Sequence, residues 1–187
     1  KYLSGDRNAI SLKAKKGAIL FFGKARCSVC HNGPLLSDFD YHSLGLSEKT
    51  DIGTKTIEDF GRFNVTKLDE DKYKFRTPPL RNTTKTAPYF HNGSAKTLRQ
   101  AIDRHLNPLK FADKYNDDGS FTMSRRQIES VSKVLSGGIQ LSEMEISNLV
   151  GFLESLNDSP PIDLMDKIIP KSVPSGLPVP WVEPYQH

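Results

Sequence analysis

The stretch Cys27-Ser28-Val29-Cys30-His31 holds both cysteines of this chain. Two thiols separated by two residues can reach the two vinyl groups of one porphyrin, and the histidine that follows then places its imidazole on the iron. A structural zinc site usually takes its four ligands from two such pairs, and the sequence has no second pair. A thioredoxin-like dithiol follows a strand, whereas this pair follows an amphipathic stretch. The motif therefore predicts one covalently bound haem c, attached through Cys27 and Cys30, with His31 as an axial ligand.

Composition limits the remaining classes of protein. A length of 187 residues leaves room for one domain of ordinary size, and 26% charged residues suit a soluble globular chain. No apolar run is long enough to span a bilayer. The formal net charge of +4 falls by about half once two haem propionates are added. Aromatic residues do not alternate with the basic residues before the haem motif, so we expect no nucleic acid partner.

The start of the chain bears on its location. The chain begins at Lys1 and shows no signal peptide, so we expect a processed protein or a part of a longer one. Haem is attached covalently outside the cytoplasmic membrane in bacteria. This chemistry predicts an exported protein in the periplasm.

Two helices are predicted at opposite ends of the haem-binding part of the chain. The segment from Ser11 to Phe22 combines helix formers with apolar residues, and Gly17 offers a point of close contact. The segment Ser142-Glu143-Met144-Glu145 has the form of a capping box, and apolar residues follow it at helical spacing up to Leu156. The first and last helices of cytochromes c cross closely, and we expect these two to do so.

The rest of the chain predicts further helices and long loops. Thr97 and Ser124 each precede a glutamine by three residues and so begin two more helices, the second ending at Gly137-Gly138. Between His31 and Lys96 the sequence reads as loops over the cofactor, with strand-like pieces at Phe63 to Thr66 and Tyr73 to Arg76. We therefore predict an all-α, cytochrome c-like helical domain around one haem over residues 1–158. An extended proline-rich tail over 159–187 is expected to pack on the domain or on a partner.

A second axial ligand has to come from elsewhere in the chain. The candidates are the remaining histidines and methionines: His42, His91, His105, His187, Met123, Met144 and Met165. On the helix that begins after Thr97, Leu98, Ala101 and Ile102 are followed at the same helical spacing by His105, which places its imidazole on the buried face. A lone histidine on an apolar face is more often a satisfied core residue than a ligand. Because the haem motif independently implies a metal, we predict that His105 is the ligand.

Three further segments carry a resemblance to a known family: Gly61-Arg62-Phe63, Phe75-Arg76-Thr77-Pro78-Pro79-Leu80-Arg81-Asn82 and Thr86-Ala87-Pro88-Tyr89-Phe90-His91-Asn92-Gly93. In this order they resemble the C-terminal, electron-transferring haem domain of the bacterial di-haem cytochrome c peroxidases, a family that includes the MauG-type maturation enzymes. The resemblance covers roughly residues 11 to 158 and is more specific than the haem motif alone. In that family a second haem domain reduces peroxide, and this sequence contains no second haem motif.

The resemblance implies a position for the sixth ligand. The peroxidases use a methionine a short helical stretch beyond the Pro-Tyr-Phe-His segment, and MauG-type enzymes use a tyrosine. In this sequence that position is His105, so the chain departs from both ligand types. We therefore predict bis-histidine ligation. Because imidazole favours ferric iron more than a thioether does, the reduction potential should lie below that of a His/Met haem.

The resemblance also implies contacts with other groups. Arg76 and Arg81 are expected partners of the haem propionates, with a solvent-facing role as the alternative. Carbonyl groups at Thr86 and Pro88 match those that bind an interdomain calcium, although one oxygen ligand would come from the second domain.

The function that the resemblance implies is an electron relay in a haem-dependent peroxidase. The chain would take electrons from a small redox protein and pass them to a second haem domain or subunit, where hydrogen peroxide is reduced to water. No residue of this chain is then predicted to be catalytic, and the chain by itself should be inactive. Two alternatives remain open, a stand-alone monohaem cytochrome and a MauG-like di-haem oxidase of a protein substrate.

Overall fold

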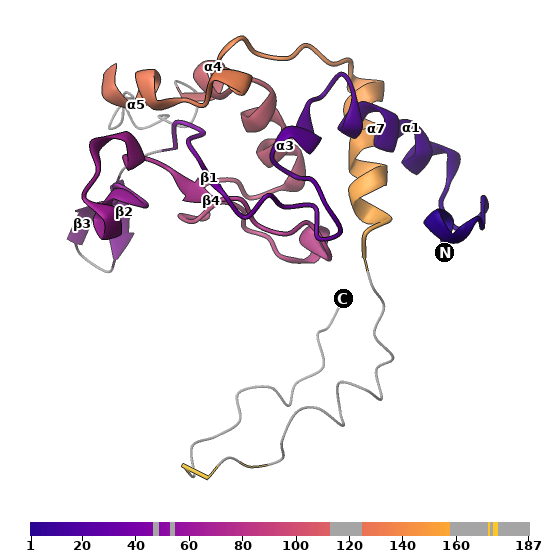
Figure 1. Ribbon diagram of the computed structural model, residues 1–187, viewed down its shortest axis with the longest axis horizontal. Helices are drawn as coiled ribbons and strands as arrows, with labels where there is room; N and C mark the ends of the chain where they lie inside the picture. Colours follow the sequence, from indigo (N-terminus) through magenta and orange to yellow (C-terminus); the bar gives the residue numbers. More distant parts are fainter. Residues whose placement is uncertain (47–48, 53–54, 113–124, 158–171, 173, 176–187) are drawn as a thin grey trace. The chain divides into compact units, whose positions relative to one another are not determined.

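The structure is a computed structural model that describes residues 1–46, 49–52, 55–112, 125–157, 172 and 174–175 (Figure 1). The chain divides into two units, Lys1–Asn157 and Asp158–His187. Of the proline-rich tail, only 172, 174 and 175 lie within the described residues, so the predicted division into a haem domain and a tail stays a prediction.

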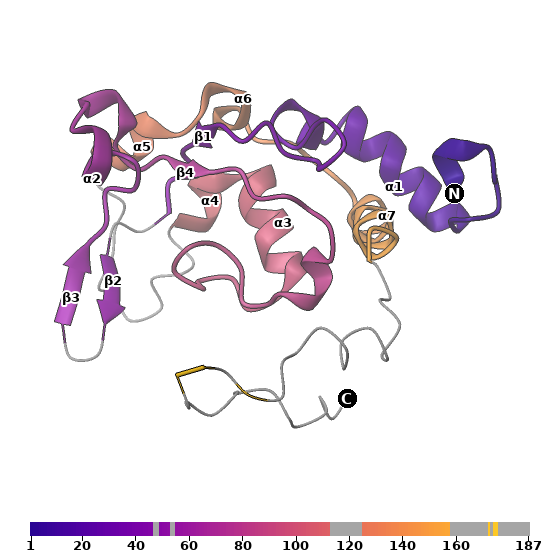
Figure 2. The ribbon, with the colours of Figure 1, turned by 60° about the horizontal axis from the view of Figure 1, so that its bottom comes forward.

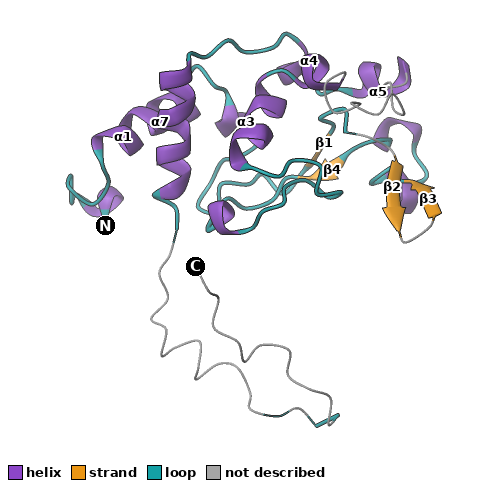
Figure 3. Ribbon diagram, turned by 180° about the vertical axis from the view of Figure 1, so that it is seen from behind, coloured by secondary structure: helices purple, strands orange, loops and turns teal. Residues whose placement is uncertain are grey.

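The fold is helical with little strand, as predicted (Figure 3). The helices are α1 Leu12–Phe22, α2 Phe63–Thr66, α3 Leu98–Leu106, α4 Pro108–Ala112, α5 Arg125–Ser130, α6 Lys133–Ser136 and α7 Glu143–Glu154. The strands are β1 Tyr41–His42, β2 Lys49–Ile52, β3 Lys55–Glu58 and β4 Phe75–Arg76. β1 pairs antiparallel with β4, and β2 pairs antiparallel with β3. None of the helices in the described part of the chain is long and apolar enough to cross a membrane.

Helices α1 and α7 cross in close contact, which confirms the predicted pair. In Figure 2, α7 is seen end-on and α1 lies lengthwise beside it. Gly17 permits this approach, because a Cβ atom there would lie 1.9 Å from the backbone oxygen of Asn148. The Ser142 hydroxyl accepts a hydrogen bond from the Glu145 backbone N–H, and the Glu145 side chain accepts one from Ser142. The predicted capping box therefore begins α7.

A small apolar core lies between these two helices. Its buried members are Phe21, Ala25, Leu149, Phe152 and Leu153. The rings of Phe21 and Phe152 lie 5.0 Å apart at a tilt, a geometry that aromatic pairs favour. Each large side chain buried in this way stabilises the fold by about 1.5–3 kcal/mol. The core fixes the end of α1 from which the haem motif follows.

Helix α3 begins with the predicted capping box at Thr97 and Gln100. It is tied to α7 through Arg99, which forms ion pairs with Asp103 on its own helix and with Glu143. Its partly buried residues Leu98 and Ile102 pack against the core between α1 and α7. These contacts set the position of His105, near the last turn of α3.

Two predictions of secondary structure are wrong. The helix expected from Ser124, which itself lies outside the described residues, to Gly137-Gly138 is two helices, α5 and α6. They separate at Ser132, whose backbone N–H donates to the carbonyl of Ser43 at 3.0 Å and whose hydroxyl accepts from the Ser43 backbone N–H at 3.1 Å. At Ser132, hydrogen bonds to a loop far away in the sequence therefore take the place of hydrogen bonds within a helix.

The segment Phe63–Thr66 forms the short helix α2 and not a strand. Residues with left-handed backbone, Gly61 and Lys67, stand on either side of this turn. The carboxylate of Asp59 accepts hydrogen bonds from the Gly61 backbone and the Asn64 side chain and so closes it. Within the other predicted strand, Tyr73 to Arg76, the residues Phe75–Arg76 pair with β1 as β4, and Lys74 forms an isolated bridge with Gly61.

Candidate haem site

The haem motif forms a short turn directly after α1. Arg26 adopts left-handed backbone, Cys27–Val29 form a turn of 3-10 helix, and the backbone N–H of His31 donates to the carbonyl of Cys27 at 2.9 Å. Cys27 and Cys30 are partly buried and not joined by a disulfide. Burial raises the pKa of Cys27 to about 12. Burial, followed by the nearby carboxylates of Asp38 and Asp40, raises the pKa of Cys30 to about 11. Both side chains are therefore neutral thiols at neutral pH.

The His31 ring is held so that one nitrogen remains for a metal. Its Nδ1 lies 3.1 Å from the carbonyl oxygen of Leu36, a contact that favours a proton on Nδ1. Burial, followed by the neighbouring His105, lowers the pKa of His31 to about 4. The ring is therefore neutral at physiological pH, and the lone pair of Nε2 can bind a metal.

His105 on α3 has the same arrangement. Its Nδ1 lies 2.8 Å from the carbonyl oxygen of Ala101, one turn earlier on the helix. Burial lowers the pKa of His105 and keeps this ring neutral too. Both imidazoles thus meet a backbone carbonyl through Nδ1, the contact that metal-binding histidines commonly make with the nitrogen that does not bind the metal.

The distance between the two rings fits a shared iron. The ring centroids of His31 and His105 lie 6.2 Å apart. Two imidazoles that bind one metal from opposite sides, with metal–nitrogen bonds of about 2 Å, have centres roughly 6 Å apart. The turn after α1 and helix α3 therefore bring together two neutral imidazoles at a separation suited to the two faces of one haem. Beside them, the thiols of the Cys-x-x-Cys turn are available for attachment.

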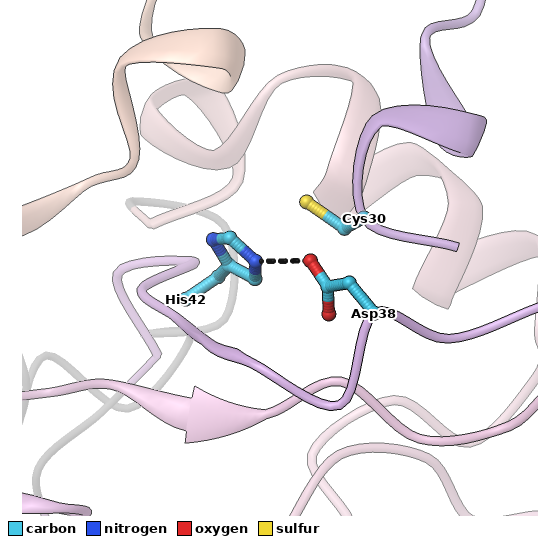
Figure 4. A group of neighbouring side chains, drawn as sticks. All are labelled: Cys30, Asp38 and His42. Atoms are coloured by element: carbon cyan, nitrogen blue, oxygen red, sulfur yellow. Dashed lines mark hydrogen bonds and ion pairs between the residues drawn. The ribbon is translucent and has the colours of Figure 1, made fainter. Parts of the chain in front are cut away.

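The other ligand candidates are placed elsewhere. The Nε2 of His42 is hydrogen-bonded to the carboxylate of Asp38 at 2.8 Å, and Cys30 lies close enough to both for the three groups to face one another (Figure 4). Burial raises the pKa of Asp38, but hydrogen bonds from His42, the Asp40 backbone and Thr77, together with the interaction with His42, lower it below its ordinary value. This trio has the spacing of a metal site, but the Cys30 sulfur is the one expected to form a thioether with haem.

His91 stacks face to face on Phe75, with ring centroids 3.6 Å apart, and its Nε2 lies 3.9 Å from a carboxylate oxygen of Asp59. Met144 is exposed on α7. Met123, Met165 and His187 lie outside the described residues. Among the described candidates, only His105 has a ring contact with His31.

The predicted contacts with propionates and calcium involve exposed residues. Arg76 lies on β4 with its guanidinium 4.8 Å from the centre of the Phe39 ring, and Arg81 is exposed. Thr86 and Pro88 are also exposed, and the Thr86 hydroxyl donates to the carbonyl of Thr83. The roles of these four residues stay predictions.

Several residues near the two imidazoles were not singled out from the sequence. The Phe90 ring stacks on His105 with centroids 5.7 Å apart, and Leu36 supplies the carbonyl that orients His31. Arg104 is buried beside His105, with its Nη2 donating to the carbonyl of Gly45 at 2.6 Å. Only Phe90 carried a signal in the sequence, because it lies within the Pro-Tyr-Phe-His segment. The other contacts depend on tertiary structure.

Comparison with known proteins places this chain in a family. The chain is 33% identical to the cytochrome-c peroxidase IdrP1 of Pseudomonas sp. (strain SCT), in a match that covers 91% of this chain and 46% of that protein. It is 36% identical to the cytochrome c551 peroxidase of Pseudomonas aeruginosa, over 86% of this chain and 38% of that protein. A MauG-like protein associated with microbial copper homeostasis has a crystal structure that matches 80% of this chain and 48% of its own, with a TM-score of 0.62 and 29% identity. No family model matches the chain.

This chain belongs to the family of bacterial di-haem cytochrome c peroxidases and MauG. Membership implies haem c as the cofactor, and the thiols of Cys27 and Cys30 with the paired imidazoles fit that group. The chain spans less than half the length of the family members it matches. The similarity therefore concerns one haem-binding part of a larger type of protein.

Proposed function

We propose that this chain is an electron-relay domain of a di-haem cytochrome c peroxidase-like enzyme. It receives electrons from a small redox protein in the periplasm and passes them to a second haem domain, where hydrogen peroxide takes up two electrons and two protons and becomes two molecules of water. The paired imidazoles of His31 and His105 carry this proposal, with centroids 6.2 Å apart and both Nδ1 atoms at backbone carbonyls. When bound, the haem supplies one-electron exchange between ferric and ferrous iron.

Each residue of the site has a defined part in this function. Cys27 and Cys30 would anchor the haem covalently, and His31 and His105 would bind its iron. With both imidazoles bound, the iron would offer peroxide no free coordination position. We propose further that Arg76 and Arg81 bind the propionates and that carbonyls of Thr86 and Pro88 contribute to a calcium site completed by the second domain.

A second candidate, a MauG-like oxidase of a protein substrate, is favoured by the structural match to a MauG-like protein. The two functions share the relay and differ in what the second domain oxidises or reduces. Mass spectrometry of proteins purified together with the full-length enzyme separates them, because only the oxidase leaves a modified side chain on a partner.

A rapid-mixing experiment on the haem-loaded chain tests the relay. The reduced small cytochrome c of the same periplasm is mixed with the ferric chain, with and without hydrogen peroxide. We expect electron transfer to the chain and little steady-state consumption of peroxide. His105→Ala should open the axial position and increase the reaction with peroxide, while His91→Ala, as matched control, should not. Rapid peroxide turnover by the unaltered chain alone would contradict the proposal.

A further inference from the structure

The loop Tyr89–Ala95 lies against the sixth-ligand side of the site. It closes on itself through the backbone N–H of Tyr89, which donates to the carbonyl of Ala95 at 2.8 Å. Ala95 is fully buried, and Gly93 donates to the carbonyl of Phe90 at 3.2 Å. The ends of the loop are therefore held together, and the residues between them have little freedom.

Two consecutive side chains of this loop point to different partners. His91 stacks on Phe75 of β4, with centroids 3.6 Å apart and ring planes 7° from parallel. Phe90 stacks instead on His105 of α3, with centroids 5.7 Å apart and planes 29° from parallel. Phe90 achieves this with a φ of 68°, in the left-handed region that bulky residues rarely adopt. A disfavoured backbone conformation thus coincides with a contact on a predicted iron ligand.

The contact supplements the hydrogen bond that orients the His105 ring. The bond from Nδ1 to the carbonyl of Ala101 restrains one edge of the imidazole. The face of the ring still needs a neighbour to prevent rotation about the side-chain bonds. Phe90 provides a flat, apolar neighbour for that face, which also keeps water and small ligands away from it.

We propose that Phe90 is a positioning residue for the sixth ligand: its ring holds the His105 imidazole in its iron-binding orientation and slows its replacement by exogenous ligands. This inference rests on the proposed function, because it takes His105 as an axial ligand. It adds a means by which the loop Tyr89–Ala95 keeps the relay haem closed to small molecules.

The chain offers a matched control in Phe39. Phe39 also has left-handed backbone, with a φ of 58°, and its ring lies by the guanidinium of Arg76. Glycine adopts such φ values without steric cost, so Phe90→Gly and Phe39→Gly both remove a ring while keeping the backbone conformation. Only the first removes the ring that stacks on His105.

The test is the rate at which cyanide binds to the ferric, haem-loaded full chain, which requires His105 to leave the iron. We expect Phe90→Gly to increase this rate about two- to tenfold, the range set by the loss of one aromatic contact. Phe39→Gly should bind cyanide at the wild-type rate. Phe90→Tyr retains the ring face and should therefore also bind cyanide at that rate. Far-UV circular dichroism checks folding. If Phe90→Gly does not fold, the cyanide-binding rate is measured in Phe90→Leu instead. Leucine keeps apolar bulk but lacks the flat face of the ring.

Electron paramagnetic resonance of the unaltered protein separates the two possible failures. A spectrum without bis-imidazole low-spin iron overturns the proposed ligation and the role of Phe90 with it. A bis-imidazole spectrum together with wild-type cyanide rates in both Phe90→Gly and Phe90→Leu overturns the role of Phe90 alone. A bis-imidazole spectrum with faster cyanide binding in the Phe90 variants, and unchanged binding in Phe39→Gly, supports both.

Discussion

The crossing of α1 with α7 and the segment between His31 and Lys96 are stabilised in different ways. The first buries aromatic and aliphatic side chains of the protein against one another around Phe21 and Phe152. The second contains only short elements in its described part, and several of its non-glycine residues have positive φ, among them Leu36, Phe39, Tyr73 and Asn82. The helix pair contains its own core, whereas the loop segment contacts both predicted ligands, His31 through the Leu36 carbonyl and His105 through the Phe90 ring. The predicted attachment points of the haem, Cys27 and Cys30, lie between α1 and the loop segment in the sequence.

Removal of the haem should produce the largest difference in stability between the loop segment and the helix pair. Cys27→Ala combined with Cys30→Ala eliminates both thioether bonds, so acid-acetone extraction should leave no haem on the protein. We expect hydrogen exchange, measured by mass spectrometry, to lose protection over residues 31–96. Residues 12–22 and 143–154 should retain most of theirs, because their contacts are with each other. Haem that stays with the double variant after extraction, or equal loss of protection in both regions, would contradict this comparison.

Gly17 is the position at which the helix pair itself can be broken. Gly17→Val places side-chain atoms against the Asn148 backbone and the Phe152 side chain, where even a Cβ lies within 2.8 Å. We expect a loss of about 3 kcal/mol in the free energy of unfolding, measured by urea titration. Gly137→Ala is the matched control, since no atom lies within 4 Å of its added Cβ. A Gly17→Val variant as stable as Gly137→Ala would show that α1 and α7 are not in close contact.

Features that depend on neighbouring residues could be predicted from the sequence, whereas features that depend on distant contacts could not. The capping boxes at Thr97 and Ser142 are local, and both were predicted because the residues that form them lie three positions apart. The burial of α3 around Ala101 follows from helical periodicity. The break at Ser132 depends on hydrogen bonds to Ser43, 89 positions earlier, and no local pattern reveals it.

The candidate site also combines features set by fixed spacings in the sequence with features set by loop conformation. The haem motif and the register of His105 are readable in the sequence, since both depend on fixed spacings. The Leu36 carbonyl that orients His31 and the Phe90 ring that stacks on His105 come from loops with left-handed backbone. Such conformations arise from tertiary contacts. The helix at Phe63–Thr66 differs from the predicted strand for a local reason, because left-handed residues stand on either side of it and Asp59 closes the turn.

The hydrogen bond between Asp38 and His42 should make the stability of the loop segment depend on pH. The bond to His42 is among those that hold the pKa of Asp38 below its ordinary value. A carboxylate with a lowered pKa contributes stability that is present above the ordinary pKa of 3.8 and is lost as the pH falls through the lower, folded-state value. We expect Asp38→Asn to destabilise the protein by about 1 kcal/mol at pH 7 and by much less once the pH falls below the folded-state pKa of this carboxyl. Urea titrations at several pH values measure this, and a difference independent of pH would rule the pair out as its source.

The smallest effect is expected at the surface of the helix region. Glu143 pairs with Arg99, but its side chain is 80% exposed, and Arg99 keeps its partner Asp103. Glu143→Gln should therefore leave the urea midpoint close to that of the unaltered protein. Ser142→Ala, one residue earlier, removes the cap of α7 and should cost about 1 kcal/mol. Equal losses in the two variants would mean that the ion pair matters as much as the cap.

The central claim is that His31 and His105 hold one haem iron, and the spectrum of the ferric protein tests it most directly. We predict low-spin iron with bis-imidazole character in electron paramagnetic resonance, and no near-infrared charge-transfer band of sulfur-ligated haem. His105→Met should create that band, and His105→Ala should turn the iron high-spin or admit water. His42→Ala and His91→Ala should give the same spectrum as the unaltered protein. A sulfur band in the unaltered protein would contradict the account, because a methionine such as Met123 would then bind the iron in place of His105.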